Sequence, residues 1–510
     1  MIQANQLGGI SHGKKHLIFR ADANASIGSG HVMRCLALAQ AWNDRGMRSL
    51  LITDSLSQNL QARLEGDQVE IIFLSCAPGT EEDADLTAAT ARKYDAAWVV
   101  VDGYQFGYIF QERIRQAGIP LLWIDDYGHA DYYSAEIILN QNAYADERLY
   151  PSRDSHTTLL LGLKYVLLRR EFAHVQHGGR TFPEVASKIL VTVGGGDPRN
   201  ITSRVIRALS GMGIGNLEIA VLIGEENPNV NYLRKMTESM PWVCLEERPE
   251  RIPALMAWAD AAIAGAGSTV WELIYTGTPF LSSVLARNQQ LVAEYLEERG
   301  LSMNLGDPDL LSDADLIAVF RNFLTSRSER EQYYLRSSGL IDGEGTSRVI
   351  MAMCNEPFRL RPVRWEDCEG IWKLANDRVV REASFHQEPI SITSHKQWFL
   401  GKIRDPHCRI YVAVDSEDRI AGQVRFDIRG EDAEIDISLA QRFRGSGYGP
   451  VLLEKALSLF IRENRIRRIH ARVKEVNQPS MRTFEMVGFI QTGRENISGS
   501  NMIHYIWGSD

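Results

Sequence analysis

The chain has 510 residues, of which 44% are hydrophobic and 24% charged, so we expect a globular protein of about two to four domains. Its net charge of −9 argues against a nucleic-acid partner. No apolar run reaches the ~20 residues that a membrane span needs, and residues 1–15 lack the apolar core of a secretory signal. Six scattered cysteines without a C-x-x-C pair argue against a structural zinc site. We therefore expect a cytoplasmic protein with a flexible tail over residues 1–15 and no membrane partner.

Residues 16–165 are predicted to form a Rossmann-like α/β domain. Short apolar segments alternate there with helical stretches such as 32–46 and 107–117. The predicted strands are His16–Arg20, Ser49–Thr53, Glu70–Leu74, Ala97–Asp102, Pro120–Asp125 and Ile137–Leu139. Alternation of this kind indicates a parallel sheet covered by helices.

The turn after the first strand carries the first candidate ligand-binding residues. Gly28-Ser-Gly-His31 stands between that strand and a helix whose apolar residues recur with helical spacing. A helix N-terminus offers unpaired N–H groups and a positive dipole end to an anion. We therefore expect Gly28 and Gly30 to lie against a phosphate, with His31 facing the same ligand. A lone histidine at such a turn is more often structural than functional.

Residues 166–350 are predicted to form a second Rossmann-like domain. Helices are expected over 268–276 and 289–299. The predicted strands are Lys188–Val193, Leu217–Ile223, Val243–Leu245, Ala261–Ala264 and Phe280–Val284. Two such domains turn the carboxyl ends of their strands toward a shared cleft, where ligands of parallel sheets bind.

Two glycine-rich turns of the second domain are candidates for binding a nucleotide diphosphate. Gly194 and Gly195 follow its first strand, and their small size lets a phosphate approach the backbone closely. The run Gly265–Pro279 opens a helix and offers further N–H donors. Glu272, one turn into that helix, can accept from two ribose hydroxyls or can simply cap the helix. The residues predicted to bind this nucleotide diphosphate are Gly28, Gly30, Gly194, Gly195, Gly265, Gly267, Ser268, Thr269 and Glu272.

These motifs together resemble a known family over about residues 16–350. The run Arg20–Ala39, with Val101-Asp-Gly-Tyr104, Ile124-Asp-Asp126 and both glycine-rich turns, resembles the UDP-2,4-diacetamido-2,4,6-trideoxy-β-L-altropyranose hydrolases of pseudaminic acid biosynthesis. The Gly265–Pro279 run alone also resembles the wider GT-B glycosyltransferases. The resemblance implies a GT-B arrangement of the two domains and hydrolysis at the anomeric carbon with inversion. It also implies that His31 activates or positions the attacking water.

The chemistry of the residues agrees with this implication. Water is a poor nucleophile near neutral pH, and imidazole is the side chain that exchanges protons in that range. UDP leaves readily once N–H groups meet its charge, and no D-x-D pair stands where a metal-dependent transferase would carry one, so no metal is expected. Asp22, Asp102 and Asp126 are expected to hold sugar hydroxyls, amides or His31. The predicted catalytic residues are His31, Asp22, Asp126 and Tyr104.

Residues 357–510 are predicted to form a third domain, of the α+β class. Strands Arg409–Val414 and Ile420–Ile428 follow one another across a short turn. Ala433–Ala440 alternates apolar with polar residues, as a half-exposed antiparallel strand does. This pattern differs from the alternation of strands and helices in the first 350 residues.

A glycine-rich turn of the third domain is a candidate pyrophosphate-binding site. Arg444-Gly-Ser-Gly-Tyr-Gly449 lies between a strand and a helix, so its backbone amides can surround a pyrophosphate. Together with Asn477-Gln-Pro-Ser480 and Phe484–Phe489, it is similar to the GNAT acetyltransferases over about residues 358–508. The resemblance implies that acetyl-CoA contacts Leu439, Arg444, Gly445, Gly447, Tyr448, Gly449, Asn477 and Ser480.

One residue departs from the GNAT pattern. Many of these enzymes carry a tyrosine, which protonates the departing thiolate, where this chain has Phe484. Ser480, a water or the substrate would have to supply the proton instead. Glu434 or Asp436 can deprotonate an amine through water, or either can be a solvated strand residue.

The sequence therefore predicts a bifunctional enzyme of pseudaminic acid synthesis. The GNAT domain would acetylate the 4-amino group of UDP-4-amino-4,6-dideoxy-N-acetyl-β-L-altrosamine, and the hydrolase would then remove UDP. Two alternatives remain open: a UDP-sugar glycosyltransferase fused to an acetyltransferase, and a hydrolase with a non-catalytic GNAT-like binding module.

Overall fold

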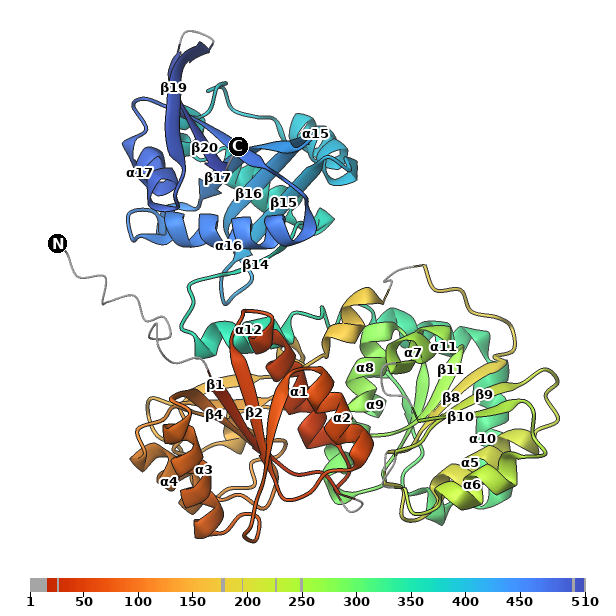
Figure 1. The fold of residues 1–510 in the computed structure, drawn as a ribbon. Coiled ribbons are helices and arrows are strands. Elements are labelled where there is room, and N and C mark those ends of the chain that lie inside the picture. Colours follow the sequence, from red (N-terminus) through yellow and green to blue (C-terminus); the bar gives the residue numbers. More distant parts are fainter. Residues whose placement is uncertain are drawn as a thin grey trace. The chain divides into compact units, whose positions relative to one another are not determined.

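The computed structural model describes residues 16–24, 27–175, 179–194, 196–224, 227–247, 251–497 and 500–508. The chain divides into two compact units, Met1–Cys354 and Asn355–Asp510. The first unit contains two parallel sheets and the second contains one mixed sheet (Figure 1). The parallel sheets and the α/β class predicted from the sequence are confirmed. Within the described residues no helix is long and apolar enough to cross a membrane, and all six cysteines are free.

The first sheet has the strand order β3-β2-β1-β4-β5-β6-β7. Its strands are β1 (His16–Ala21), β2 (Arg48–Thr53), β3 (Val69–Phe73), β4 (Ala96–Asp102), β5 (Leu121–Ile124), β6 (Ile137–Asn140) and β7 (Thr158–Leu161). One face packs on α1 (Gly30–Asn43), α2 (Gln58–Gly66) and α12 (Gly345–Met353), the other on α3 (Glu81–Lys93) and α4 (Tyr108–Gln116). Successive strands are added to one side of β1 up to β3 and to its other side from β4 onward, so the strand order reverses between β1 and β4. Ligands of such sheets bind at this point of reversal.

Helix α1 is buried along most of its length. Its residues from His31 to Leu38 are buried except Met33, because α12 and the short helix η3 (Arg170–His174) also contact it. A polar residue in its first turns is therefore held away from water and needs a partner.

The second sheet has the strand order β10-β9-β8-β11-β12-β13 and is also parallel. Its strands are β8 (Lys188–Thr192), β9 (Glu218–Leu222), β10 (Val243–Glu246), β11 (Ala261–Gly265), β12 (Phe280–Ser283) and β13 (Met303–Asn304). One face packs on α5 (Ile201–Ser210), α6 (Val230–Thr237) and α10 (Asp313–Thr325), with α11 (Arg327–Ser337) beside them. The other face packs on α7 (Ile252–Trp258), α8 (Thr269–Thr276) and α9 (Gln290–Glu298).

The second unit has the strand order β14-β15-β16-β17-β18-β20-β19. Its strands are β14 (Arg359–Pro362), β15 (Cys408–Val414), β16 (Ile420–Arg429), β17 (Asp432–Leu439), β18 (Arg468–Lys474), β19 (Ile490–Ile497) and β20 (Ser500–Gly508). Helices α16 (Tyr448–Glu463) and α17 (Gln478–Met486) cover one face. Helices α13 (Cys368–Ala375) and α15 (Ile392–Arg404) cover the other, with the short α14 (Arg378–Ala383) between them in sequence.

Strands β17 and β18 are the one parallel pair of this mixed sheet. Their register covers Asp432–Glu434 against Arg468–His470 and ends there, although β17 continues to Leu439 and β18 to Lys474. Beyond Glu434 and His470, the facing edges of β17 and β18 are not paired by backbone hydrogen bonds. Their backbone N–H and C=O groups can therefore bind an extended ligand.

Candidate active sites

His31 lies at the reversal point of the first sheet, in the first turn of α1. It is 7% exposed, and its Nδ1 lies 2.6 Å from Oδ1 of Asp102, the last residue of β4. A carboxylate can only accept a hydrogen bond, so Nδ1 carries the proton in this pair. The imidazole is thereby held in the tautomer whose Nε2 is an acceptor, which is the form that a general base needs.

Arg34 shares Asp102 with His31. Its Nε donates to Asp102 Oδ2 at 2.9 Å and its Nη2 to Oδ1 at 2.7 Å, while Nη1 donates to Asp126 Oδ1 at 2.7 Å. Arg34 Nη2 and His31 Nδ1 lie 3.0 Å apart, because both donate to the same Asp102 oxygen. The sequence analysis did not single out Arg34. Its spacing of three residues from His31, which puts both on one helix face, was the available signal.

Asp126 collects hydrogen bonds from several directions. The Tyr104 hydroxyl donates to its Oδ2 at 2.5 Å, and Asn142 Nδ2 donates to its Oδ1 at 2.8 Å. Burial opposes ionisation, but Arg34 and these donors hold the pKa of Asp126 below its usual range. Burial and the charge of Asp126 raise the pKa of Tyr104 well above its usual range. Tyr104 is therefore a neutral group whose proton points at Asp126.

The second domain contacts this cluster through two side chains. Asn288 Nδ2, in the short helix η5 (Arg287–Gln289), donates to the Tyr104 hydroxyl at 2.9 Å. Trp271 Nε1, in α8, donates to Asn142 Oδ1 at 3.2 Å. Both Tyr104 and Asn142 bind Asp126, so this carboxylate is connected to the second domain by two separate chains of hydrogen bonds.

Asp22 belongs to a different network. Its Oδ1 accepts from Arg20 Nη1 at 2.6 Å and from the backbone N–H of Asp54 at 2.7 Å, and its Oδ2 accepts from Gln105 Nε2 at 2.8 Å. Among the predicted catalytic residues, the structure thus brings His31, Tyr104 and Asp126 together and holds Asp22 in a separate network with Arg20, Asp54 and Gln105.

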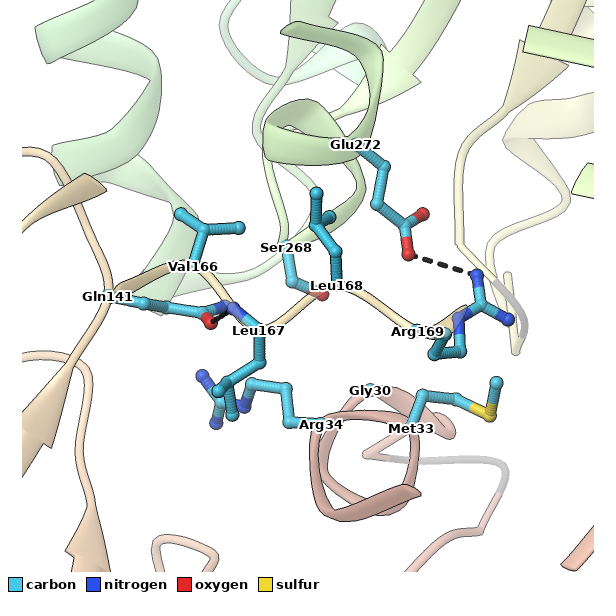
Figure 2. A pocket seen from close by; sticks show the side chains of 10 residues that line it. All are labelled: Gly30, Met33, Arg34, Gln141, Val166, Leu167, Leu168, Arg169, Ser268 and Glu272. Atoms are coloured by element: carbon cyan, nitrogen blue, oxygen red, sulfur yellow. Dashed lines mark hydrogen bonds and ion pairs between the residues drawn. The ribbon is translucent and has the colours of Figure 1, made fainter. Parts of the chain in front are cut away.

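The glycine turn before α1 faces the turn before α8. A Cβ added to Gly30 would lie 3.8 Å from Ser268 Oγ. Between these turns lies a narrow pocket of about 20 Å³, which has room for about one water molecule (Figure 2). Its walls come from α1, from the connection Val166–Arg169 and from the start of α8. The two predicted anion-binding turns therefore lie on opposite sides of one pocket.

Glu272 lines this pocket one turn into α8. Its Oε1 lies 3.0 Å from Arg169 Nη2, the contact drawn in Figure 2. Burial raises the pKa of Glu272, and the positive charge of Arg169 opposes that rise. The ion pair fixes the carboxylate in the pocket that Ser268 also lines.

The remaining residues predicted to bind UDP lie at strand ends. Gly28, with φ of +70°, donates its N–H to Asn24 O at 2.8 Å in the turn before α1. Gly194 follows β8 and Gly265 ends β11, and because these strands are parallel neighbours both glycines lie at the same sheet edge. Gly267, Ser268 and Thr269 lead into α8 from there, with Ser268 as its N-cap, while Gly195 lies outside the described residues. Within those described residues, no group of three or more His, Cys, Asp or Glu side chains is placed to hold a metal.

The predicted pyrophosphate turn of the second unit leads from Leu439, the last residue of β17, into α16. Gly445 and Gly447 have φ values of +75° and +80°, and Gly447 is the N-cap of α16, directly before Tyr448. The Arg444 side chain turns back into the protein. Its Nε donates to Leu439 O at 2.8 Å and its Nη1 lies 2.8 Å from Asp377 Oδ1. These two contacts of Arg444 stabilise the turn between β17 and α16.

The start of α17 adjoins the start of α16. Asn477 is the N-cap of α17, and its side chain accepts from the N–H of Ser480 at 3.3 Å. A Cβ added to Gly449 would lie only 2.7 Å from Thr483 Oγ1, so the first turn of α16 touches the second turn of α17. The predicted acetyl-CoA residues therefore lie at the N-termini of α16 and α17, two helices in contact with each other. These helices follow β17 and β18, whose pairing ends at Glu434 and His470.

The two carboxylates of β17 that the sequence left as alternatives differ in their surroundings. Glu434 Oε1 accepts from Arg472 Nη1 at 2.6 Å. Asp436 has a side chain that is 48% exposed, and its nearest cation is Arg425 at 3.8 Å. Phe484 is 3% exposed and packs against Phe489 and Tyr505. Asp436 is therefore the more open of the two carboxylates, and Phe484 is part of the core.

Comparisons with known proteins agree with this division of the chain. The model of the acetyltransferase (GNAT) domain matches residues 358–490. The spore coat polysaccharide biosynthesis protein SpsG of Bacillus subtilis is 25% identical over 66% of this chain and 96% of its own length. The UDP-2,4-diacetamido-2,4,6-trideoxy-beta-L-altropyranose hydrolase of Campylobacter jejuni is 25% identical over 56% of this chain and 97% of its own length.

A third relative spans nearly the whole chain. An uncharacterized protein of Methanocaldococcus jannaschii is 22% identical over 93% of this chain and 97% of its own length. The two-part organisation is therefore shared by a distant relative. The chain is a homologue of SpsG and of the Campylobacter jejuni hydrolase. In addition, this chain carries a C-terminal GNAT acetyltransferase domain.

Proposed function

We propose that this protein is a bifunctional enzyme that acts on a UDP-activated diamino-trideoxy sugar. The first unit hydrolyses UDP-2,4-diacetamido-2,4,6-trideoxy-β-L-altropyranose to UDP and the free sugar. The GNAT domain transfers the acetyl group of acetyl-CoA to the 4-amino group of the precursor. The relatives supply the substrate class, and pseudaminic acid synthesis is the pathway in which the two steps follow each other.

The observation that carries the hydrolase proposal is the pairing of His31 with Asp102 opposite the α8 turn. Nε2 of His31 accepts a proton from water while the water oxygen forms a bond to the anomeric carbon. The bond from that carbon to the UDP oxygen breaks on the opposite side, which inverts the centre. The N–H groups around Ser268 receive the charge that develops on the leaving diphosphate.

In the GNAT domain, acetyl-CoA supplies the acetyl group, and the residues of the chain bind and orient the reactants. The turn Gly445–Gly449 binds the pyrophosphate through backbone N–H groups, and the unpaired edges of β17 and β18 receive the pantetheine arm. Asp436 attracts the ammonium form of the substrate and takes its proton through a water. Glu434 is less suited to that role, because Arg472 already neutralises it.

Product analysis tests both halves. Purified full-length protein is incubated with the diacetamido UDP-sugar, and separately with the 4-amino UDP-sugar and acetyl-CoA. We expect UDP and a free sugar of inverted configuration in the first case, detected by ¹H NMR before mutarotation. In the second case we expect a mass increase of one acetyl group and one equivalent of free CoA thiol.

Two other outcomes would support the alternatives. Transfer of the sugar to an added acceptor, with UDP release only in its presence, would indicate a glycosyltransferase. The buried Phe484 motivates the second alternative, because a phenyl ring cannot protonate a thiolate. Tight binding of acetyl-CoA without turnover by any 4-amino nucleotide sugar would indicate a binding module.

A further inference from the structure

The cluster around His31 contains more charge than a simple histidine–carboxylate pair. Two carboxylates, Asp102 and Asp126, face one guanidinium, that of Arg34, which is 7% exposed. Arg34 donates two hydrogen bonds to Asp102, at 2.9 and 2.7 Å, and two to Asp126, at 2.7 and 3.2 Å. With a neutral His31 the cluster has one net negative charge, and without the guanidinium it would have two.

This charge balance matters because the proposed reaction needs a neutral imidazole. Two carboxylates close to an imidazole favour its protonated form, and an imidazolium cannot accept a proton from water. We propose that Arg34 is a positioning residue that keeps His31 in its neutral, proton-accepting form by neutralising the carboxylates that surround it. The inference rests on the proposed hydrolase function. It adds that Arg34 determines the pH range over which His31 can act as a base.

The other groups that face His31 do not take over this role. Tyr104 packs its ring edge-on to the imidazole with centroids 5.0 Å apart, and it is neutral because its pKa is raised by burial and by Asp126. Burial and Asp102 raise the pKa of the Cys35 thiol, so it is neutral too. On the side of the second domain, Glu272 and Arg169, which line the pocket beside Arg34, form an ion pair with each other. His129 packs against Tyr104 but pairs with Asp125, its Nδ1 lying 3.0 Å from Asp125 Oδ2. Among the described residues, Arg34 is thus the cation that hydrogen-bonds both Asp102 and Asp126.

A purely structural role predicts different behaviour. Arg34 also joins α1 to the ends of β4 and β5, so its loss could lower the rate by loosening the site. Loosening lowers the rate by a similar factor at every pH. Loss of a neutralising charge moves the acidic limb of the pH profile, because a larger fraction of His31 is then protonated at neutral pH.

The experiment measures UDP release by the full-length protein from the diacetamido UDP-sugar between pH 5 and 9. We expect Arg34→Met to move the acidic limb of kcat/KM upward by roughly 1–3 pH units, the range typical for the loss of one neighbouring charge. Asp126→Asn removes a negative charge from the same cluster, so we expect its acidic limb to move downward. Shifts of opposite sign do not arise from general damage to the fold.

Arg348→Met is the matched control. Arg348 is 4% exposed and lies in α12 of the same unit, and its Nη1 donates to Asp342 Oδ1 at 2.9 Å rather than to Asp102 or Asp126. Its substitution removes a buried guanidinium that pairs with a carboxylate, as Arg34 does, and should leave the midpoint of the acidic limb unchanged. A uniform rate loss for Arg34→Met at all pH values, or equal shifts for Arg34→Met and Arg348→Met, would overturn the proposal.

A second readout separates this inference from the proposed function. The ¹³Cε1–¹H signal of His31, assigned by its disappearance in His31→Ala, is titrated by NMR in the wild type and in both cluster variants. A higher midpoint in Arg34→Met and a lower one in Asp126→Asn support the role of Arg34 even if the wild type releases no UDP, which would refute the function alone. Unchanged midpoints, with UDP release intact, refute the role of Arg34 alone.

Discussion

Replacing Gly447 tests whether the turn before α16 holds a pyrophosphate. Gly447 has φ of +80°, in the left-handed region, where a residue with a Cβ costs about 1–2 kcal/mol. For a unit of this size, each kcal/mol lowers the melting temperature by about 2–4 °C, so Gly447→Ala should lower that of the GNAT domain by about 2–8 °C. That loss of stability is expected whether or not the turn binds a ligand.

The effect on acetyl-CoA distinguishes the two possibilities. A hydrogen bond from a backbone N–H to a charged group contributes about 1.5–3 kcal/mol, so losing one should weaken binding roughly 10- to 150-fold. Calorimetric titration of the full-length protein with acetyl-CoA measures this directly. Gly430→Ala is the control, because Gly430 has φ of +66° and open space around it in the hairpin between β16 and β17.

The two variants should therefore melt similarly and bind differently. Gly430→Ala should show the same loss of stability and retain its affinity for acetyl-CoA. If Gly447→Ala folds and binds acetyl-CoA as tightly as Gly430→Ala does, the turn does not hold the pyrophosphate and our assignment of the site is wrong.

Three further predictions concern the first unit. His31→Ala should reduce UDP release by ~10²–10⁴-fold and leave acetyl transfer intact, since a general base typically contributes that much; a near-normal rate would place the base elsewhere. Glu272→Ala should raise KM for the UDP-sugar more than it lowers kcat, because a ribose contact is made equally in the ground and transition states; a collapse of kcat at constant KM would mean that Glu272 acts on the reacting sugar. Burial lowers the pKa of His129, but the hydrogen bond and charge of Asp125 outweigh burial and raise this pKa overall. The wild type should therefore be more stable than His129→Gln. This advantage should be complete below about pH 6.5, the pKa of histidine in the unfolded chain, and should decline as the pH rises. Urea unfolding of both proteins between pH 6 and 9 measures that difference, and a difference that grows with pH would contradict the assignment.

Much of the framework follows from local patterns in the sequence. The alternation of apolar segments with helices predicts both parallel sheets, and the glycine turns mark the helix starts that face the pocket. Two edge strands were not predicted. The two residues of β13 carry little periodic signal, whereas β7 was missed although it is as long as β5 and β6.

The pairing of His31 could not be derived from the sequence in the same way. Asp22 and Asp102 both lie at strand ends, and which of them meets the histidine depends on which face of the sheet each side chain occupies and which helix covers that face. Asp22 binds Arg20, which pairs with Asp83 of α3, and Gln105, which follows β4, so it belongs to the side of the sheet that α3 covers. Asp102 ends β4 on the side that α1 covers and binds His31 there. Arg34 likewise acquires its role only when the ends of β4 and β5 lie side by side. Contacts of this kind come from topology, which local propensity does not specify.

The position of α12 has a consequence for dividing the protein into separately expressed halves. The helix follows the second domain in sequence, yet Val349, Ile350 and Met353 are buried in the core of the first domain. A fragment of the first unit that ended at the last helix of the second domain, α11, would leave an open apolar groove along α1 and should aggregate. The boundary for such a fragment is therefore Cys354, and the GNAT domain is tethered directly to the domain that contains His31. Movements of the second domain during catalysis would leave that tether in place.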